Sequence, residues 1–198
     1  MPQLSENYAI CLIEDYQPST SILKKTLLES HYQVLKHIDF KSNIVAEITD
    51  ISPDVLILST EALTSMVLKQ LGEINEIAPL PIIIFSETDS PAMIKDVIKV
   101  GVSAFIVHEI LPQRLPSIIS VARARFRSMQ ALRNELKQTK TQLQGRKYID
   151  RAKGLIMSQK NINEQQAYQQ LRKMAMDQST SLADVAKNII DVCELLAP

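Results

Sequence analysis

The sequence predicts an α/β domain with a five-stranded parallel sheet, followed by a long helix and a small three-helix bundle. As far as residue 107, short runs of branched apolar residues alternate with stretches of helical spacing. Beyond Leu115 the pattern is helical only. The 198 residues are enough for one domain of ordinary size and a smaller one.

Each strand and helix of the first domain is predicted from its own apolar pattern. Buried strands are predicted at residues 9–13, 34–38, 55–58, 82–85 and 104–107, the second being the weakest. Helices are predicted between them at residues 19–30, 41–50, 64–77 and 91–100, the last ending at Gly101. Strands that alternate with helices form a parallel sheet, and its functional residues lie at the carboxyl ends of the strands.

The long helix carries an apolar stripe. Its members recur at alternating three- and four-residue steps: Leu115, Ile118, Ala122, Met129, Leu132, Leu136, Thr139 and Leu143, with Arg125 as an interruption. This spacing predicts a short parallel coiled coil and a homodimer, and the expected seam consists of Met129, Leu132, Leu136 and Leu143. A helix that packs on its own α/β domain has a similar stripe, which is the alternative.

The rest of the chain predicts a compact three-helix tail. The long helix is expected to end at residue 159. Asn163, with Gln166 three residues on, is expected to cap a second helix that runs through Met176, and Ser181 to cap a third, with Asp184 completing a capping box. One small core is expected from the apolar residues Leu155, Ile156, Ala167, Leu171, Ala175, Leu182, Val185, Ala186 and Ile189. Small residues are expected to allow close helix packing at Ala152, Gly154, Ala167 and Ala175.

The net charge of zero conceals an acidic half and a basic half. Residues 1–116 hold 8 Lys and Arg against 15 Asp and Glu, whereas residues 117–198 hold 14 against 7. Such asymmetry indicates domains with different partners, although two halves that attract each other are the alternative. We expect a domain at residues 1–116, a helical linker or coiled coil at residues 117–145 and a second domain at residues 146–198.

Polar residues follow the predicted strands. Glu14 and Asp15 follow the first strand, and Ser59, Ser86 and His108 follow the third, fourth and fifth. The segments IEDY, PDVLILST, PIIIFSE and GVSAFIVHEI resemble response-regulator receiver domains over essentially the whole first half. The resemblance implies a flavodoxin-like fold with a Mg²⁺-dependent phosphoacceptor pocket at these five residues.

Two residues depart from the receiver pattern. The phosphoacceptor position, an Asp in ordinary receivers, is Ser59, and the position of the receiver lysine is His108. Ser59 lacks the carboxylate that helps to hold Mg²⁺ and accepts the phosphoryl group. We therefore expect a degenerate receiver pocket without aspartyl phosphorylation, resident metal or other cofactor. A weakly bound divalent ion at Glu14 and Asp15 is one alternative, and a solvated acidic loop is the other.

The last third of the chain contains AKGLIM, AY, LRKMAM and LADVAKNII in that order. Over about residues 146–195 this set resembles the ANTAR domain of transcription antitermination regulators. The resemblance implies binding to a leader mRNA with two small stem-loops, which prevents an overlapping terminator hairpin from forming. A three-helix ANTAR bundle is thus the expected output domain.

Basic residues cluster in the same segment. The candidates for RNA contact are Arg146, Lys147, Arg151, Lys153, Tyr168, Arg172 and Lys173. Cations neutralise phosphates, and a tyrosine ring or an arginine guanidinium stacks on an exposed base. Tyr168 and Arg172 are four residues apart and share one helix face. A half-buried helix aromatic and solvated lysines are the alternative explanations. For Gly154, admission of the RNA backbone is an alternative or additional role to close helix packing.

The stretches GVSAFIVHEI, ARFRSMQALRNEL, RAKGLIM and CELL resemble the nitrate/nitrite assimilation members of this family. That resemblance implies control of nitrate and nitrite assimilation genes. It also implies an inhibitory partner, a cytosolic nitrate/nitrite-sensing protein. Because the acceptor Asp is missing, we expect this partner, and not phosphorylation, to gate the regulator.

Other classes find less support in the sequence. The chain has no Gly-rich phosphate loop, metal-ligand cluster or nucleophile–His–acid set, so no catalytic residue is expected. A DNA-binding response regulator is the alternative function, but the last helix is largely apolar with Lys187 as its one lysine. No apolar run has membrane length and no signal-peptide pattern occurs, which predicts a cytoplasmic protein. Cys11 and Cys193 are expected to be buried and unpaired.

Overall fold

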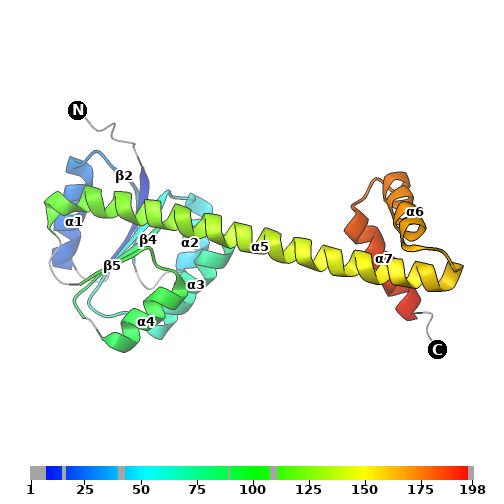
Figure 1. Cartoon of the computed structure of the whole chain (residues 1–198). Coiled ribbons are helices and arrows are strands. Elements are labelled where there is room, and N and C mark those ends of the chain that lie inside the picture. Colours follow the sequence, from blue (N-terminus) through cyan, green and yellow to red (C-terminus); the bar gives the residue numbers. More distant parts are fainter. Residues whose placement is uncertain (1–7, 15–16, 40–42, 89, 108–110, 196–198) are drawn as a thin grey trace. The chain divides into compact units, whose positions relative to one another are not determined.

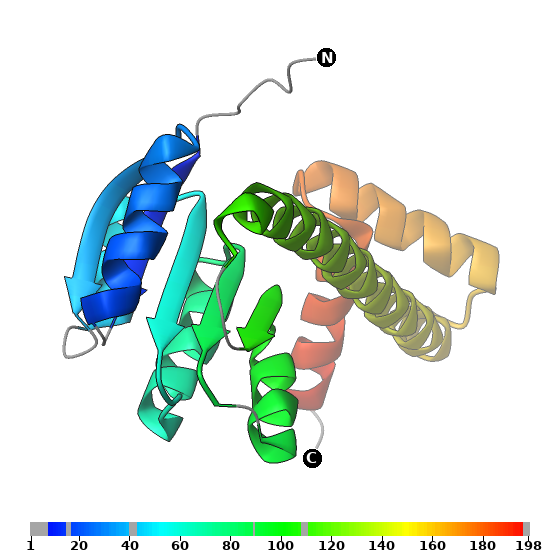
Figure 2. The same cartoon turned by 90° about the vertical axis from the view of Figure 1, so that its left-hand side faces the viewer.

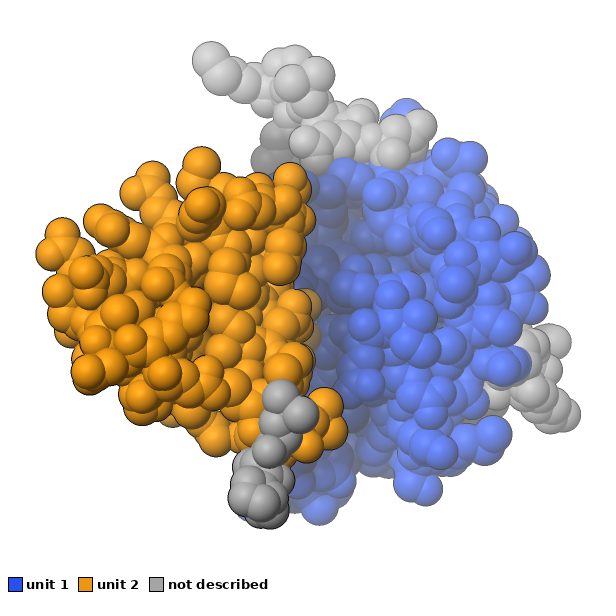
Figure 3. Space-filling view, turned by 90° about the vertical axis from the view of Figure 1, so that its right-hand side faces the viewer, with its two compact units in different colours: residues 1–130 blue, residues 131–198 orange. Residues whose placement is uncertain are grey.

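The chain forms two compact units. The structure is a computed structural model that describes residues 8–14, 17–39, 43–88, 90–107 and 111–195. The first unit comprises residues 1–130 and the second comprises residues 131–198 (Figure 3). Each unit has a hydrophobic core of its own, so each is described separately.

The first unit is a parallel sheet with helices on both faces (Figures 1 and 2). Its strands are β1 (Ala9–Glu14), β2 (Gln33–Asp39), β3 (Val55–Thr60), β4 (Ile82–Ser86) and β5 (Ala104–Val107). Its helices are α1 (Gln17–Glu29), α2 (Ile44–Ile51), α3 (Ser65–Ile77), α4 (Pro91–Val100) and the 3-10 turn η1 (Pro112–Arg114). The strand order is β2-β1-β3-β4-β5, and all pairs are parallel. The predicted receiver-like fold class is confirmed.

Alternate strand residues fill two cores, one on each face of the sheet. Cys11, Ile13, Leu56 and Leu58 face the core that α2, α3 and α4 cover. Ile10, Leu12, Val55 and Ile57 face the core that α1 and the next helix cover. The central strands are therefore buried on both faces, which explains their unbroken apolar runs. Burial raises the pKa of the Cys11 thiol to about 11, so the thiol stays protonated at neutral pH.

Local signals set the ends of α4 as the sequence predicted. The Ser90 hydroxyl accepts a hydrogen bond from the Met93 backbone N–H at 3.1 Å, and Pro91 occupies the start of the helix. Gly101 ends the helix with φ of 86°, a conformation that glycine adopts without strain.

Helix α5 (Leu115–Lys160) is continuous, and its first turns pack on the receiver-like sheet. Leu115 and Ala122 are buried in that core together with Ile119. The coiled-coil interpretation of the stripe is therefore wrong at its amino-terminal end, where the apolar residues face their own domain. The Arg123 guanidinium also lies 3.3 Å from the centroid of the Tyr8 ring, which adds a cation–π contact. Neither α5 nor any other described helix is long and apolar enough to cross a membrane.

The second unit is a three-helix bundle made by the end of α5, α6 (Glu164–Asp177) and α7 (Leu182–Leu195). Its buried residues are Ala152, Ile156, Ala167, Leu171, Ala175, Val185, Ala186 and Ile190. Ile190 was missed by the sequence prediction, which placed Ile189 in the core instead. Ile189, Leu155 and Leu182 line that core and are only partly buried. Cys193 is also only partly buried, contrary to expectation.

The glycine that permits close packing in this bundle is Gly145 and not Gly154. A Cβ atom at Gly145 would lie 3.2 Å from the Ala183 Cβ atom, a contact that brings α5 and α7 together. A Cβ atom at Gly154 would meet no atom within 4 Å. The predicted packing role of Gly154 is therefore wrong, while Ala152, Ala167 and Ala175 are buried as expected.

Candidate nucleic-acid interface

Capping residues fix where α6 and α7 begin. The Asn163 side chain accepts a hydrogen bond from the Gln166 backbone N–H at 2.9 Å, and the Asn163 N–H donates to Gln166 Oε1 at 3.2 Å. This capping box is the one that the sequence predicted. At α7 the Ser181 hydroxyl accepts from the Asp184 N–H at 3.1 Å but donates to the Asp184 carboxylate at 2.6 Å. The second predicted box is thus only half formed, because the carboxylate binds the hydroxyl and not the backbone.

Four of the predicted cations are exposed and have no partner among the residues that the structure describes. Arg146 and Lys147 lie on α5, and Arg172 and Lys173 lie on α6. None of the four forms an ion pair with another described residue. Their positive charge is therefore available to a polyanion such as the phosphate backbone of RNA.

Arg151 and Lys153 already have carboxylate partners. Arg151 donates to Glu194 Oε1 at 2.6 Å, and more than half of each of these two side chains is exposed. Lys153 Nζ lies 2.8 Å from Asp150 Oδ1 and 2.6 Å from Glu164 Oε1. These contacts raise the pKa of the Lys153 ammonium, mainly through the hydrogen bonds to Asp150 and then to Glu164.

Tyr168 presents part of its ring to solvent. It lies on α6, is 43% exposed, and precedes Arg172 by four residues. A half-exposed ring beside a guanidinium is a suitable platform for an unpaired base. It is also what a helix aromatic at the margin of a core looks like, so the role of Tyr168 stays a prediction.

The degenerate receiver pocket is brought together at the carboxyl ends of β1, β3 and β4. Glu14 pairs in register with Ser59, and Thr60 pairs with Ser86. Glu14, Ser59 and Ser86 are all buried. The Ser86 hydroxyl donates to the Thr88 carbonyl at 3.1 Å, which ties it to the loop that follows β4. Asp15 and His108, the other two predicted pocket residues, lie outside the described residues.

His37 is a member of this site that sequence reasoning missed. Its Nε2 lies 3.2 Å from Glu14 Oε2, across the pair formed by β1 and β2. The Glu14 side chain therefore faces the neighbouring strand β2. Within the part of the chain that the structure describes, no group of three His, Cys, Asp or Glu residues is placed to hold a metal ion. The sequence places His37 near the end of the predicted strand 34–38. Only the register of β1 and β2 shows that its side chain meets that of Glu14.

The predicted seam of α5 consists of exposed apolar side chains. Met129, Leu132, Leu136 and Leu143 are between 47% and 58% exposed. Isolated exposed apolar residues are ordinary, but four at heptad spacing on one helix are typical of a surface that pairs with another helix.

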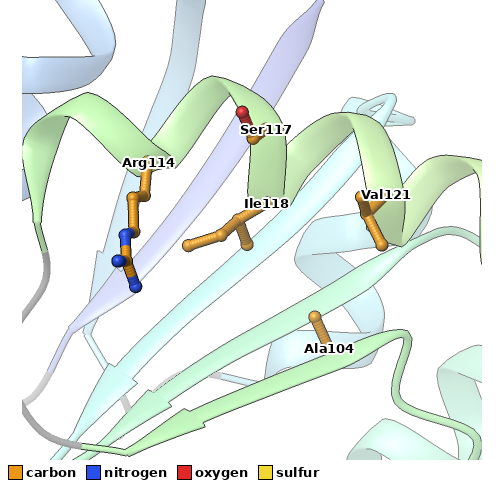
Figure 4. A pocket seen from close by; sticks show the side chains of 5 residues that line it. All are labelled: Ala104, Arg114, Ser117, Ile118 and Val121. Atoms are coloured by element: carbon orange, nitrogen blue, oxygen red, sulfur yellow. The ribbon is translucent and has the colours of Figure 1, made fainter.

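A shallow hollow lies between β5 and the first turns of α5 (Figure 4). Its volume is about 440 Å³, and it is lined by Ala104, Arg114, Ser117, Ile118 and Val121. The lining is almost entirely apolar, and Arg114 and Ser117 form no nucleophile–base pair. The hollow therefore adds no support for an enzymatic function.

Comparison with known proteins gives a family match in the last third of the chain. Residues 137–190 match the ANTAR domain, which begins earlier on α5 than the motifs alone indicated. The chain thus combines a receiver-like fold in its first unit with a segment that matches the ANTAR domain in its second.

Two relatives are similar to parts of the chain. It is 25% identical over 139 residues to the transcriptional regulatory protein PdtaR of Mycobacterium tuberculosis, covering 70% of this chain and 68% of that protein. It is 33% identical over 75 residues to the nitrate regulatory protein of Klebsiella oxytoca, covering 38% of this chain and 19% of that protein. The second match supports in part the resemblance to nitrate/nitrite regulators of the NasT type.

Solved receiver structures share the fold of the first unit. The signal receiver domain of a modulated diguanylate cyclase from Desulfovibrio desulfuricans has a TM-score of 0.54 and 16% identity. The likeness covers 63% of this chain and 99% of that chain. At this identity the likeness concerns the fold alone.

Proposed function

We propose that the chain is an RNA-binding transcription antiterminator that binds a leader mRNA with two stem-loops and prevents terminator formation. The ANTAR match at residues 137–190 is the observation that carries the proposal. The exposed cations on α5 and α6, which pair with none of the described carboxylates, support it, because they supply the charge that phosphate contacts need. Residues 1–116, 117–145 and 146–198 then act as receiver-like domain, linker and RNA-binding domain.

The proposed contact surface combines charge with one aromatic ring. Arg146, Lys147, Arg172 and Lys173 neutralise phosphates, and Tyr168 stacks on a base of a loop. Arg151 is part of this surface through its exposed side chain, although Glu194 competes for its guanidinium.

The target genes are those of nitrate and nitrite assimilation. The nitrate regulatory protein of Klebsiella oxytoca and the sequence resemblance support this assignment. A cytosolic nitrate/nitrite-sensing protein gates the regulator by contact. The buried Ser59 at the phosphoacceptor position supports gating of this kind, because a serine hydroxyl lacks the carboxylate chemistry of an ordinary receiver.

A homodimer brings two ANTAR domains to the two loops. The exposed stripe of Met129, Leu132, Leu136 and Leu143 supports pairing of two α5 helices. Two linked domains bind paired stem-loops more tightly than one, because the second contact is intramolecular.

Gel-shift binding of the full chain to twin stem-loop leader RNA tests the proposal. We expect Arg172→Ala to weaken binding about tenfold, which is ~1.4 kcal/mol, and the wild-type affinity to fall steeply with salt. The control is Lys187→Ala, a change of an exposed cation on α7, which should bind normally. A salt-independent affinity, or unchanged binding by Arg172→Ala, would overturn the proposed surface.

A DNA-binding response regulator is less well supported. The last helix α7 has the position of a recognition helix, but it carries Lys187 against Asp184, Asp191 and Glu194. A net negative helix is repelled by the phosphates that flank the major groove.

A further inference from the structure

Lys153 joins α5 to the start of α6. Its ammonium lies 2.8 Å from Asp150 Oδ1, one turn earlier on α5, and 2.6 Å from Glu164 Oε1, at the first position of α6. The Lys153 side chain is only 16% exposed, whereas Glu164 and Asp150 are more than two-thirds exposed. The lysine is thus the sheltered centre of a three-residue cluster that we call the Lys153 cluster.

The charge of this cluster disfavours a phosphate. One ammonium and two carboxylates give a net charge of −1, and two of the three ammonium hydrogens are directed at carboxylates. A phosphate that approached Lys153 would have to displace a carboxylate or accept its repulsion. The open cations Arg172 and Lys173 on α6 offer phosphates a better site.

The connection that the Lys153 cluster spans is short. Residues 161–163 link the two helices, and Asn161 adopts a left-handed conformation with φ of 52°. A second cross-link, from Lys160 Nζ to Gln170 Oε1 at 2.8 Å, lies close by. The direction in which α6 leaves α5 therefore depends on polar contacts as well as on the apolar core.

We propose that Lys153 is a positioning residue that holds the first turn of α6 against α5, so that Tyr168, Arg172 and Lys173 face the RNA. This inference rests on the proposed function, since α6 carries the proposed contact residues. Lys153 itself makes no phosphate contact.

The test compares Lys153→Met, Glu164→Gln and the double variant in the full chain. Hydrogen exchange of peptides from residues 161–170 measures, without RNA, how firmly the Lys153 cluster holds the first turn of α6. We expect each single change to speed exchange there at least threefold. The double variant should exchange no faster than the worse single variant, because both changes remove the same contact. The double-mutant cycle also separates the Lys153–Glu164 interaction from the interaction of Glu164 with the dipole of α6.

RNA binding gives the second readout, with twin stem-loop leader RNA as the probe. We expect Lys153→Met and Glu164→Gln to weaken binding several-fold without changing the slope of affinity against salt. Lys173→Met is the matched control, because it should leave exchange unchanged and reduce the salt slope.

The sign of the Glu164→Gln effect decides between positioning and direct contact. If Lys153 bound a phosphate, removal of its competing carboxylate would strengthen binding or leave it unchanged, and that result would overturn the inference. Unchanged exchange in both single variants would also overturn it. If the wild-type chain binds none of the RNAs, the proposed function fails, while the exchange cycle still decides whether Lys153 clamps α6.

Discussion

Gly154 lies inside a helix although nothing in the bundle requires a glycine there. A Cβ atom would meet no neighbour within 4 Å, and Gly154 is not among the residues with positive φ. A glycine inside a helix costs up to about 1 kcal/mol relative to alanine. A bare helix surface three residues after Arg151 therefore suits the close approach of an RNA backbone.

Gly154→Ala should raise stability and weaken RNA binding at the same time. The expected gain is about 0.5–1 kcal/mol in the free energy of unfolding, measured by thermal or urea unfolding. Gly145→Ala is the matched control and should gain less stability than Gly154→Ala, since its Cβ atom would lie 3.2 Å from the Ala183 Cβ atom. An unchanged RNA affinity for Gly154→Ala would contradict the close approach of RNA at this residue.

Ser59 should prevent phosphorylation of the receiver-like domain. Incubation with acetyl phosphate and Mg²⁺ is expected to leave no acid-labile phosphate on the chain, because the residue beside Glu14 has no carboxylate to accept it. Intact-mass measurement checks this, with an ordinary receiver as the positive control. One phosphate per chain would refute gating by protein contact alone.

At the scale of elements, the stripe along α5 has two kinds of neighbour. Periodicity indicated the stripe correctly, but it does not distinguish a helix that packs on its own sheet from one that pairs with another helix. Only burial separates the two, with Leu115 and Ala122 enclosed by the receiver-like domain and Leu136 exposed.

Leu136→Asp is expected to produce monomers that bind RNA more weakly. A carboxylate in the seam of a coiled coil loses its hydration and faces the same carboxylate of the partner helix, which destabilises the dimer. The second RNA contact is lost with the dimer. Light scattering measures the mass, and Gln138→Asp, which places the same charge off the stripe, is the control. A monomeric wild-type chain would rule out the seam.

The capping box at the start of α6 should contribute measurably to stability. Asn163→Ala removes the acceptor for the Gln166 N–H and is expected to cost about 0.5–2 kcal/mol. Circular dichroism during heating measures the loss. Asn188→Ala, an exposed change inside α7, should be neutral or slightly stabilising. Equal melting temperatures for both variants would show that the box adds nothing.

At the scale of the whole molecule, the architecture could be predicted from the sequence. The side-chain contacts between distant segments could be found only from the structure. Alternating apolar runs gave the five parallel strands, and Asn163 with Gln166 gave the start of α6. The side-chain contact between Glu14 and His37 depends on the register of β1 and β2, which aligns Leu12 with His37 and which no local pattern contains. The contact between Lys153 and Glu164 could not be predicted for a similar reason. It crosses the connection between α5 and α6, whose direction the sequence does not specify.

Positive and negative charge are concentrated in different halves of the chain, as the proposed function requires. Residues 117–198 hold 14 basic and 7 acidic residues and carry a net charge of +7. Residues 1–116 hold 8 basic and 15 acidic residues and carry a net charge of −7. Most of the net positive charge lies in residues 117–145, with 6 basic residues against 1 acidic, and residues 146–198 hold 8 against 6. Under the proposed function, this basic part of the chain attracts RNA, and the acidic first domain is left for a protein partner.

Single-round transcription through a nitrate-assimilation leader and its terminator tests the central claim most directly. The chain should increase read-through on the intact leader and have no effect when the loop sequences are changed while the stems are kept. Unchanged termination on every leader that the chain binds would contradict an antitermination function, and binding that prefers matched duplex DNA to the leader RNA would favour the DNA-binding alternative.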